Sequence, residues 1–293
     1  MDIEDTVRIR QPSEANSLLL PVMIGCSHNE CTFCVTYKGQ KFHIRPFADI
    51  KKDIDQIARH YGRSVRKIFL ENGDALVLSQ FSLVRVLEYI NKSFPNREWI
   101  GTYANAISVL RKSVDDLKQL RELGLSLIYL GIESGDDEVL KRICKGSTHA
   151  EMVEAGRRIK AAGITLSLTV LLGIGGEDLS ERHAVATGKI ISEIDPDFAG
   201  ALTVIVCEGT PLYDEMQAGK FKLITPMQSL QELRTILANT NCTSCFFTSN
   251  HASNYLPLKL KLPEEKEEGL RILDEVLAGS DRYHLRPEGL RAL

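Results

Sequence analysis

Three of the seven cysteines, Cys26, Cys31 and Cys34, fall within nine residues and form a C-x4-C-x2-C pattern. Three thiolates on one loop suit a cubane iron–sulfur cluster whose fourth iron has no cysteine and stays open to a cofactor or substrate. A structural zinc ion usually has four ligands, and His28 could be the fourth. A disulfide is disfavoured because the group has three members and a reducing compartment is expected. Three unrelated buried thiols would not be expected so close together.

The other four cysteines are more widely spread. Cys144 and Cys207 stand alone, whereas Cys242 and Cys245 form a C-x2-C pair. That pair could ligate an auxiliary cluster together with Cys207, form a redox pair, or consist of spare thiols. An auxiliary cluster usually requires more cysteines than one pair supplies.

The composition is that of an ordinary globular protein. Of 293 residues, 43% are hydrophobic and 26% are charged, which argues against disorder. The net charge of −3 does not favour a protein that coats nucleic acid, although a local patch could hold tRNA. The longest apolar runs, at 17–24 and 164–174, are too short to span a bilayer as helices, and the acidic N-terminus has no apolar signal region. We therefore expect a cytoplasmic protein.

The elements that must position the cysteines alternate between short strands and longer amphipathic helices. The pattern predicts six strands, at 18–25, 67–71, 98–104, 126–133, 164–172 and 197–206. The helices that follow them are predicted at 47–61, 79–92, 114–123, 137–144, 150–162, 179–193 and 226–238. Repeated strand–helix units predict an α/β fold with a parallel sheet, either an open barrel or a doubly wound sheet. In both, ligands bind at the carboxyl ends of the strands.

Polar and glycine-rich segments occur at these strand ends. The first strand leads into the cysteine loop, and the later strands end in polar segments at 71–75, 102–105, 131–135, 171–177 and 206–211. Any one of them alone would be an ordinary strand-to-helix turn. Their recurrence beside three cysteines indicates a shared site.

With these motifs the sequence resembles the radical S-adenosylmethionine (SAM) superfamily. The resemblance lies in the cysteine loop with Phe33, in Asn72-Gly-Asp74, in Tyr129-Leu-Gly-Ile-Glu-Ser-Gly135 and in Gly173-Ile-Gly-Gly176. It covers about residues 18–240, and the third motif is similar to the branch with oxygen-independent coproporphyrinogen oxidases and elongator-type catalytic subunits. The superfamily's commonest cysteine spacing is C-x3-C-x2-C, so the first gap here is one residue longer.

This resemblance implies a partial (β/α)6 barrel with parallel strands, followed by a short C-terminal cap segment. It also implies a [4Fe–4S] cluster on Cys26, Cys31 and Cys34 whose open iron is chelated by SAM. Reductive cleavage of SAM would then give a 5′-deoxyadenosyl radical, with electrons from an external donor such as flavodoxin or ferredoxin. The expected substrate is a small molecule or a tetrapyrrole, and no membrane partner is expected.

The resemblance also implies roles in binding SAM. Phe33 would contact the adenine, or else pack at the barrel lip. Gly73 and Asp74 occupy the position at which the family holds the SAM amino group, and many members have Gly-Gly-Glu there.

Three later positions complete this expected SAM site. Glu133 could accept hydrogen bonds from the ribose or form a salt bridge. Lys145 would bind the SAM carboxylate, with Arg142 as the competing choice. Gly173, in the segment 173–176, would let backbone approach the adenosyl group.

The segment 241–261 shows little helical or strand pattern and is expected to be a long loop. It could close the barrel mouth and contribute His251, Asn254 or Tyr255, so His251 and Tyr255 are catalytic candidates. Alternatively it packs Phe246 and Phe247 against the outer helices. A last helix is predicted at 263–278. The expected division is an N-terminal extension at 1–17, a core at 18–240 and a cap at 241–293.

Two other functions fit the same cysteine loop. One is a non-catalytic iron–sulfur or zinc protein, which would bind metal but not SAM. The other is a radical methylating or sulfur-inserting enzyme acting on RNA. We expect the latter less, because only seventeen residues precede the first predicted strand and the tail is short.

Overall fold

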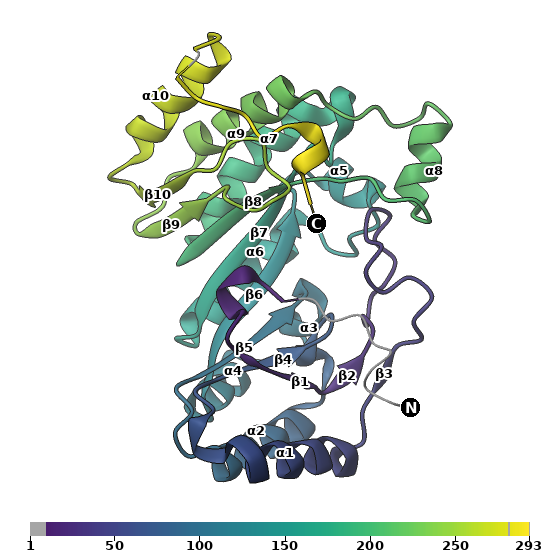
Figure 1. Ribbon diagram of the computed structural model, residues 1–293, viewed down its shortest axis with the longest axis vertical. Coiled ribbons are helices and arrows are strands. Elements are labelled where there is room, and N and C mark those ends of the chain that lie inside the picture. The colour runs from purple at the N-terminus through teal and green to yellow at the C-terminus, as the bar shows by residue number, and fades with distance from the viewer. Residues whose placement is uncertain (1–9, 281, 293) are drawn as a thin grey trace. The chain divides into compact units, whose positions relative to one another are not determined.

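The computed structural model describes residues 10–280 and 282–292, which form two compact units (Figure 1). Of the described residues, the first contains 10–29, Thr36–Leu130 and Ala155–Leu166. The second contains Glu30–Val35, Gly131–Glu154 and the residues from Ser167 onward. The cysteine loop is therefore shared, with Cys26 in the first unit and Cys31 and Cys34 in the second.

The first unit is built on parallel strands. Their order is β1 (Leu18–Pro21), β4 (Lys67–Glu71), β5 (Trp99–Ala104) and β6 (Leu125–Glu133), the last of which ends in the second unit. The helices between them are α1 (Phe47–Tyr61), α2 (Gln80–Ser93), α3 (Ala106–Leu110) and α4 (Val114–Glu122). The helical spacing of Ile50 and Ile54 buries one face of α1, and α1 packs against α2.

The first predicted strand is divided. The run expected to continue to residue 25 leaves the parallel sheet after Pro21, and β2 (Met23–Ile24) pairs antiparallel with β3 (His43–Ile44). Because proline has no backbone N–H, Pro21 suits the end of a ladder. The pairing of β2 with β3 closes the segment that contains the cysteines, and neither β3 nor α3 was predicted.

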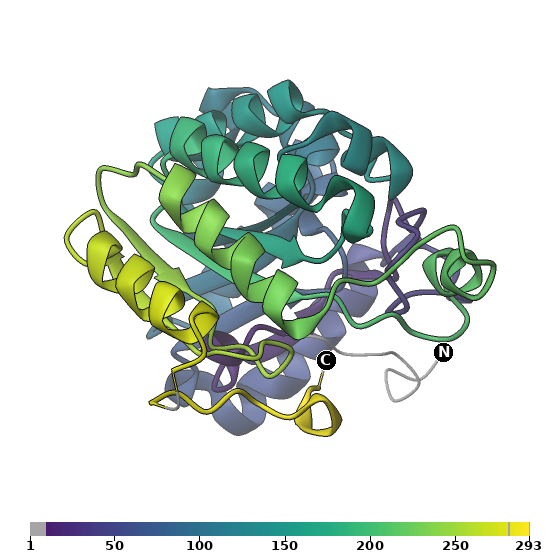
Figure 2. The ribbon, with the colours of Figure 1, turned by 90° about the horizontal axis from the view of Figure 1, so that it is seen from above.

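The second unit continues the alternation. Here β7 (Thr165–Leu172) pairs parallel with β8 (Phe198–Thr203), and β8 pairs parallel with β9 (Cys245–Thr248). Its helices are α5 (Asp137–Arg142), α6 (His149–Ala161), α7 (Gly176–Ile194), α8 (Pro211–Gln217), α9 (Pro226–Asn239) and α10 (Lys266–Leu277), of which α6 ends in the first unit. Helices α7, α9 and α10 pack side by side, as Figure 2 shows.

The prediction of a structureless segment at 241–261 is wrong. Strand β9 extends the sheet of the second unit, and β10 (Lys259–Leu262) pairs antiparallel with it, Leu260 opposite Phe247. Alternating burial along Lys259–Leu262 is the usual two-residue period of a strand with one covered face. Each strand has only four residues, which is too short for a clear pattern in the sequence.

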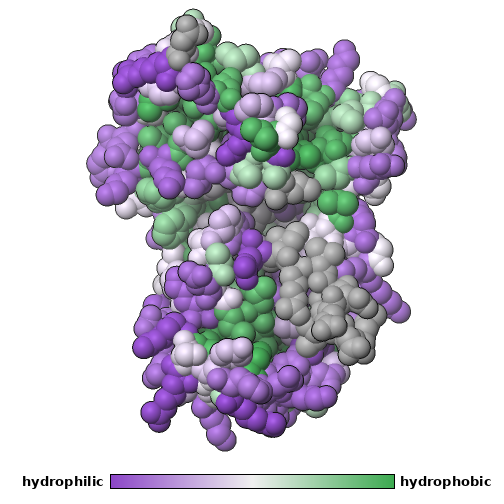
Figure 3. Space-filling view, in the orientation of Figure 1, coloured by the Kyte–Doolittle hydropathy of each residue, from purple (hydrophilic) through white to green (hydrophobic). Residues whose placement is uncertain are grey.

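Polar residues predominate on the outer faces of α1 and α10. Figure 3 shows mainly hydrophilic surface over α1 and α10, whose inward faces bury Ile54 and Leu273. The predicted α/β fold with mainly parallel strands is confirmed in each unit.

Candidate cofactor site

The turn that carries Cys26 packs against the end of β4. Gly25, with φ of 78°, accepts a 3.1 Å hydrogen bond through its carbonyl from the Gly73 N–H. A Cβ at Gly73 would lie 2.7 Å from the Cys26 Cβ and 2.9 Å from its Sγ. Only glycine therefore fits at position 73 while the cysteine keeps its place.

Asp74 is buried and stabilises this turn through hydrogen bonds. Its Oδ1 accepts from the Leu76 N–H at 3.2 Å, which caps the 3-10 turn Ala75–Val77. Its Oδ2 accepts from the hydroxyls of Ser27, at 3.2 Å, and Ser108. Burial raises the pKa of Asp74 to about 7, although these hydrogen bonds favour the charged form. Asp74 thus anchors the residue next to Cys26.

Asn72 is the site residue that the sequence reasoning passed over. It is 1% exposed, and in the described part of the chain neither its side-chain nitrogen nor its oxygen has a hydrogen-bond partner. Its φ of 78° is rare outside glycine. A buried amide costs free energy unless something satisfies it. The amide therefore fits a polar ligand held beside Gly73, and its place immediately before the expected site positions Gly73 and Asp74 was the available signal.

The other two cysteines are fixed by backbone contacts in the second unit. The Thr32 N–H donates to the Ile143 carbonyl at 3.0 Å, and the Thr32 carbonyl accepts from the Leu212 N–H at 3.0 Å. The loop is thereby held between the end of α5 and the start of α8. Cys31, Phe33 and Cys34 remain partly exposed.

Glu133 and Lys145 form an ion pair with each other. Their Oε1 and Nζ are 2.8 Å apart, and the side chains are 11% and 12% exposed. A Cβ at Gly131 would lie 2.5 Å from the Glu133 oxygen, so this glycine leaves room for the pair. Glu133 has a φ of 59°, a strained conformation at the end of β6. The competing candidate, Arg142, instead pairs with Asp178 at 3.0 Å.

The segment 173–176 is a tight turn at the end of β7. Gly173 and Gly176 have φ of 79° and 67°, and the Gly176 N–H donates to the Gly173 carbonyl at 3.1 Å. A Cβ at Gly173 would lie 3.1 Å from Ile224 and 3.2 Å from Val204. Backbone conformation and packing both require glycine at position 173. The Gly173 N–H donates to Glu232 of α9, a residue that the motif reading did not single out.

A comparison with known protein families identifies the family of this chain. The model of the Radical SAM superfamily matches residues 20–187. The chain belongs to the radical SAM superfamily. Its members use a [4Fe–4S] cluster and SAM, which fits a donor set of three cysteines and a buried amide without a partner.

Individual curated proteins are similar to the chain over about two thirds to three quarters of its length. The tRNA-2-methylthio-N(6)-dimethylallyladenosine synthase of Bordetella petrii is 28% identical over 74% of the chain and 47% of its own length. The heme chaperone HemW of Bacillus subtilis is 23% identical over 63% of the chain and 48% of its own length. The chain spans about half the length of these curated relatives.

The fold is also that of solved radical SAM structures. Coproporphyrinogen III oxidase from Escherichia coli superposes with a TM-score of 0.56 at 17% identity, over 76% of the chain and 51% of the oxidase. The chain thus has the partial-barrel α/β fold of this superfamily. In the part of the chain that the structure describes, no helix is long and apolar enough to cross a membrane.

The three loop cysteines are divided between the two units. Among residues 10–280 and 282–292, no three His, Cys, Asp or Glu side chains are grouped as metal ligands. All seven cysteines are thiols, and those of the loop belong to different units. Their role as ligands stays a prediction based on spacing and family.

The two catalytic candidates lie in the C-terminal network of the second unit. His251 Nδ1 is 2.9 Å from the Ser253 hydroxyl, and burial, followed by Arg286, lowers the pKa of His251. The Tyr255 hydroxyl donates to Glu288 at 2.5 Å and accepts from Arg291 at 2.7 Å. Burial, followed by the bond to Glu288, raises the pKa of Tyr255 to about 12. Their catalytic role stays a prediction.

The remaining cysteines separate into two environments. Cys242 and Cys245 are buried, and the hydrogen bond between their thiols, with burial, raises the pKa of Cys245. Cys207 interacts electrostatically with Cys34, and burial raises the pKa of its thiol. The auxiliary cluster on Cys242 and Cys245 stays a prediction.

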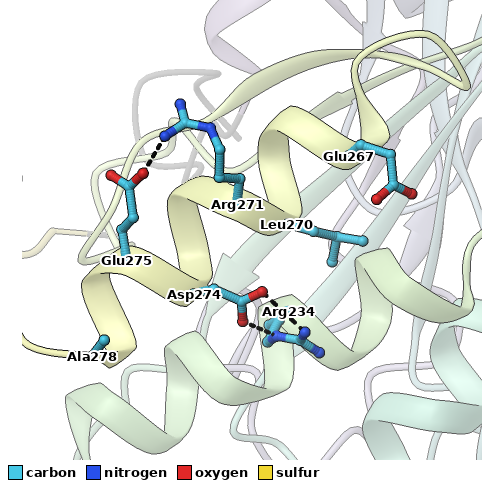
Figure 4. Close-up of a pocket in the computed structure, with 7 residues that line it drawn as sticks. All are labelled: Arg234, Glu267, Leu270, Arg271, Asp274, Glu275 and Ala278. Atoms are coloured by element: carbon cyan, nitrogen blue, oxygen red, sulfur yellow. Dashed lines mark hydrogen bonds and ion pairs between the residues drawn. The ribbon is translucent and has the colours of Figure 1, made fainter.

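A surface pocket of about 490 Å³ lies between α9 and α10 (Figure 4). Figure 4 shows that Arg234 pairs with Asp274, and Arg271 with Glu275, across or beside it. None of the predicted site residues lines this pocket, and the arginines within it are paired. It is separate in its residues from the cofactor site.

Proposed function

We propose that the chain is a radical SAM enzyme whose cluster is held by Cys26, Cys31 and Cys34. SAM bound to such a cluster supplies a 5′-deoxyadenosyl radical once an external donor, such as flavodoxin or ferredoxin, delivers an electron. The protein's part is to bind, orient and shield the cofactor.

The observation that supports this most directly is the buried amide of Asn72. Its donor and acceptor lack partners in the described residues, and it is next to Gly73, which contacts Cys26. We infer that Asn72 and the Gly73 backbone bind the polar methionine part of SAM. Asp74 acts through Ser27, because both its oxygens already accept hydrogen bonds.

Glu133 and Lys145 serve the other polar groups of SAM. Glu133 accepts from the ribose hydroxyls, and Lys145 holds the carboxylate of Glu133 in place while its positive charge attracts the carboxylate of SAM. The turn at Gly173 borders the adenosyl group. Phe33 offers its ring to the adenine.

Anaerobic reconstitution tests the proposal. The wild-type protein should bind about four irons and, when reduced, convert SAM to 5′-deoxyadenosine. Cys31→Ala should lose the cluster, whereas Cys144→Ala, which removes an exposed cysteine outside the loop, should keep it. An intact cluster without any SAM cleavage product would show that the enzymatic proposal is wrong. Calorimetry with SAM separates that outcome from a protein that does not bind SAM at all.

For the substrate we propose a small molecule or a tetrapyrrole. A second candidate is tRNA, favoured by the 28% identity to the tRNA-modifying synthase of Bordetella petrii. Nucleic acid is therefore a candidate despite the net charge of −3. SAM cleavage should be measured with a reduced tetrapyrrole and with total tRNA. Stimulation by tRNA, with a methylthio group on digested nucleosides, would replace the first candidate by the second.

A further inference from the structure

Glu232 is a buried carboxylate with two short hydrogen bonds. It lies on α9 and is 2% exposed. Its Oε2 accepts from the Gly173 N–H at 2.6 Å, and its Oε1 accepts from the Ser180 hydroxyl at 2.6 Å. One residue of α9 thus holds the turn after β7 and the first turns of α7.

The two hydrogen bonds to Glu232 described above come from uncharged donors. Nε2 of the buried His183 is 3.9 Å from Oε2 and has no hydrogen-bond partner among the described residues. Burial lowers the pKa of His183 to about 4 and raises the pKa of Glu232 to about 7. A neutral imidazole facing a carboxylate is not an ion pair. Keeping an acid in this place therefore costs stability, and a hydrophobic residue would pack there at less cost.

Helix α7, which carries His183, also contacts the segment that follows β6. His183 Nδ1 is 2.8 Å from the hydroxyl of Ser134, and the Gly135 N–H donates to the Thr187 hydroxyl at 3.1 Å. Ser134 follows Glu133, the proposed ribose ligand. Polar side chains of α7 and α9 thus fix the backbone of both loops that are expected to receive SAM in this unit.

We propose that Glu232 is a positioning residue that sets the Gly173 turn in the conformation that binds SAM. It does not contact the cofactor itself. Its carboxylate fixes the direction of the Gly173 peptide, and through that peptide the path of the 173–176 segment. This inference rests on the proposed function, because it takes SAM as the ligand of the turn.

The first measurement needs no cofactor. Hydrogen exchange in the cluster-free protein should show a protected Gly173 amide in wild type and about tenfold faster exchange in Glu232→Ala, because the acceptor is lost. Glu232→Gln keeps an amide oxygen for Gly173 and should restore most of the protection. Gln231→Ala, on the same helix but without this contact, is the matched control.

The second measurement is SAM affinity of the reconstituted protein by calorimetry. Glu232→Ala should weaken SAM binding about tenfold with unchanged iron content, while Glu232→Gln and Gln231→Ala stay near wild type. Saturating SAM should recover the cleavage rate of Glu232→Ala, so that KM rises and kcat does not fall. A purely structural role would lower the unfolding temperature without this split.

The outcomes are distinct. Unchanged exchange at Gly173, or faster exchange with unchanged SAM affinity, would overturn the positioning role. Failure of the wild-type protein with full iron content to bind SAM would overturn the proposed function, and with it the assignment of SAM to this turn. The hydrogen bond between Glu232 and Gly173 would still be established by the exchange data.

Discussion

At the level of single residues, the cofactor site depends on side chains that are buried and polar. Asp74 is the clearest case, since burial raises its pKa from 3.8 to about 7. The folded state therefore prefers the protonated acid. Stability from this residue is greatest at low pH, falls as pH rises from about 4 to about 7, and is then constant.

Asp74→Asn removes this titration and tests it. The variant should gain stability relative to wild type as pH rises through 4 to 7, by on the order of a few kcal/mol at the plateau. Denaturant unfolding at pH 5, 6, 7 and 8 measures the difference. Asp115→Asn, which removes the charge of an exposed carboxylate, is the matched control. A variant that loses stability relative to wild type over this range would show that the hydrogen bonds outweigh burial.

Gly73→Ala tests the contact with Cys26. The added methyl group would lie 2.7 Å from the Cys26 Cβ and 2.8 Å from its Cα, so the cysteine turn must move. We expect a folded protein with substantially less iron after reconstitution, measured by iron content and visible absorbance. Gly289→Ala meets no atom within 4 Å and should load fully. Equal loading of both variants would contradict the proposed arrangement.

At the level of elements, helices α7 and α9 pack closely against each other at a glycine. A Cβ at Gly188 of α7 would lie 2.5 Å from the Ile236 carbonyl oxygen of α9, so the two backbones are in direct contact there. In sequence, a glycine in mid-helix looks only like a penalty. The close approach of α7 and α9 leaves no room for a side chain at this position.

Gly188→Ala should therefore destabilise the protein, although alanine is the better helix former. We expect a loss of about 1–3 kcal/mol, as for other overpacked contacts. Thermal unfolding measures it, and Gly200→Ala, where the nearest atoms are 3.8 Å away, is the control. Because α9 carries Glu232, the exchange of Gly173 should rise as well. A gain in stability would mean that the helices separate without cost.

The sequence predicted the longer helices and strands. The alternation of strands and amphipathic helices was readable because each has many residues and one buried face. The pairs β2–β3 and β9–β10 have two or four residues per strand, so their partners are set by tertiary contacts rather than by local pattern. Glu232 had one readable signal, a carboxylate near Leu233 and Ile236 on the buried face of its helix.

The residues of the candidate site could be predicted from the sequence, but their contacts with one another could not. The spacing indicated Cys26, Cys31 and Cys34 as candidate ligands. The strand-end motifs and the family resemblance indicated Gly73, Glu133 and Gly173 as candidate SAM contacts. The mutual pairing of Glu133 with Lys145, and the engagement of both Asp74 oxygens, depend on three-dimensional neighbours. No single-sequence pattern distinguishes a carboxylate that waits for a ligand from one that is already paired.

At the level of the whole molecule, cofactor binding should be visible as stability. A ligand that binds only the folded state adds about 2.7 kcal/mol at a hundredfold excess over its dissociation constant. SAM should thus raise the unfolding temperature of the reconstituted protein by several degrees. Cys31→Ala, without the cluster, should show little or no shift. An equal shift in both proteins would indicate that SAM binds without the cluster.

The different burial of the cysteines gives the protein a built-in chemical reporter. Cys144 is exposed and should react rapidly with an alkylating reagent in every state, whereas Cys242 and Cys245 should be labelled only after unfolding. The three partly exposed loop thiols should be modified in the cluster-free protein and shielded once iron and sulfide are bound. Mass spectrometry of alkylated peptides would then count loaded, empty and unfolded molecules in one sample, without purification to homogeneity.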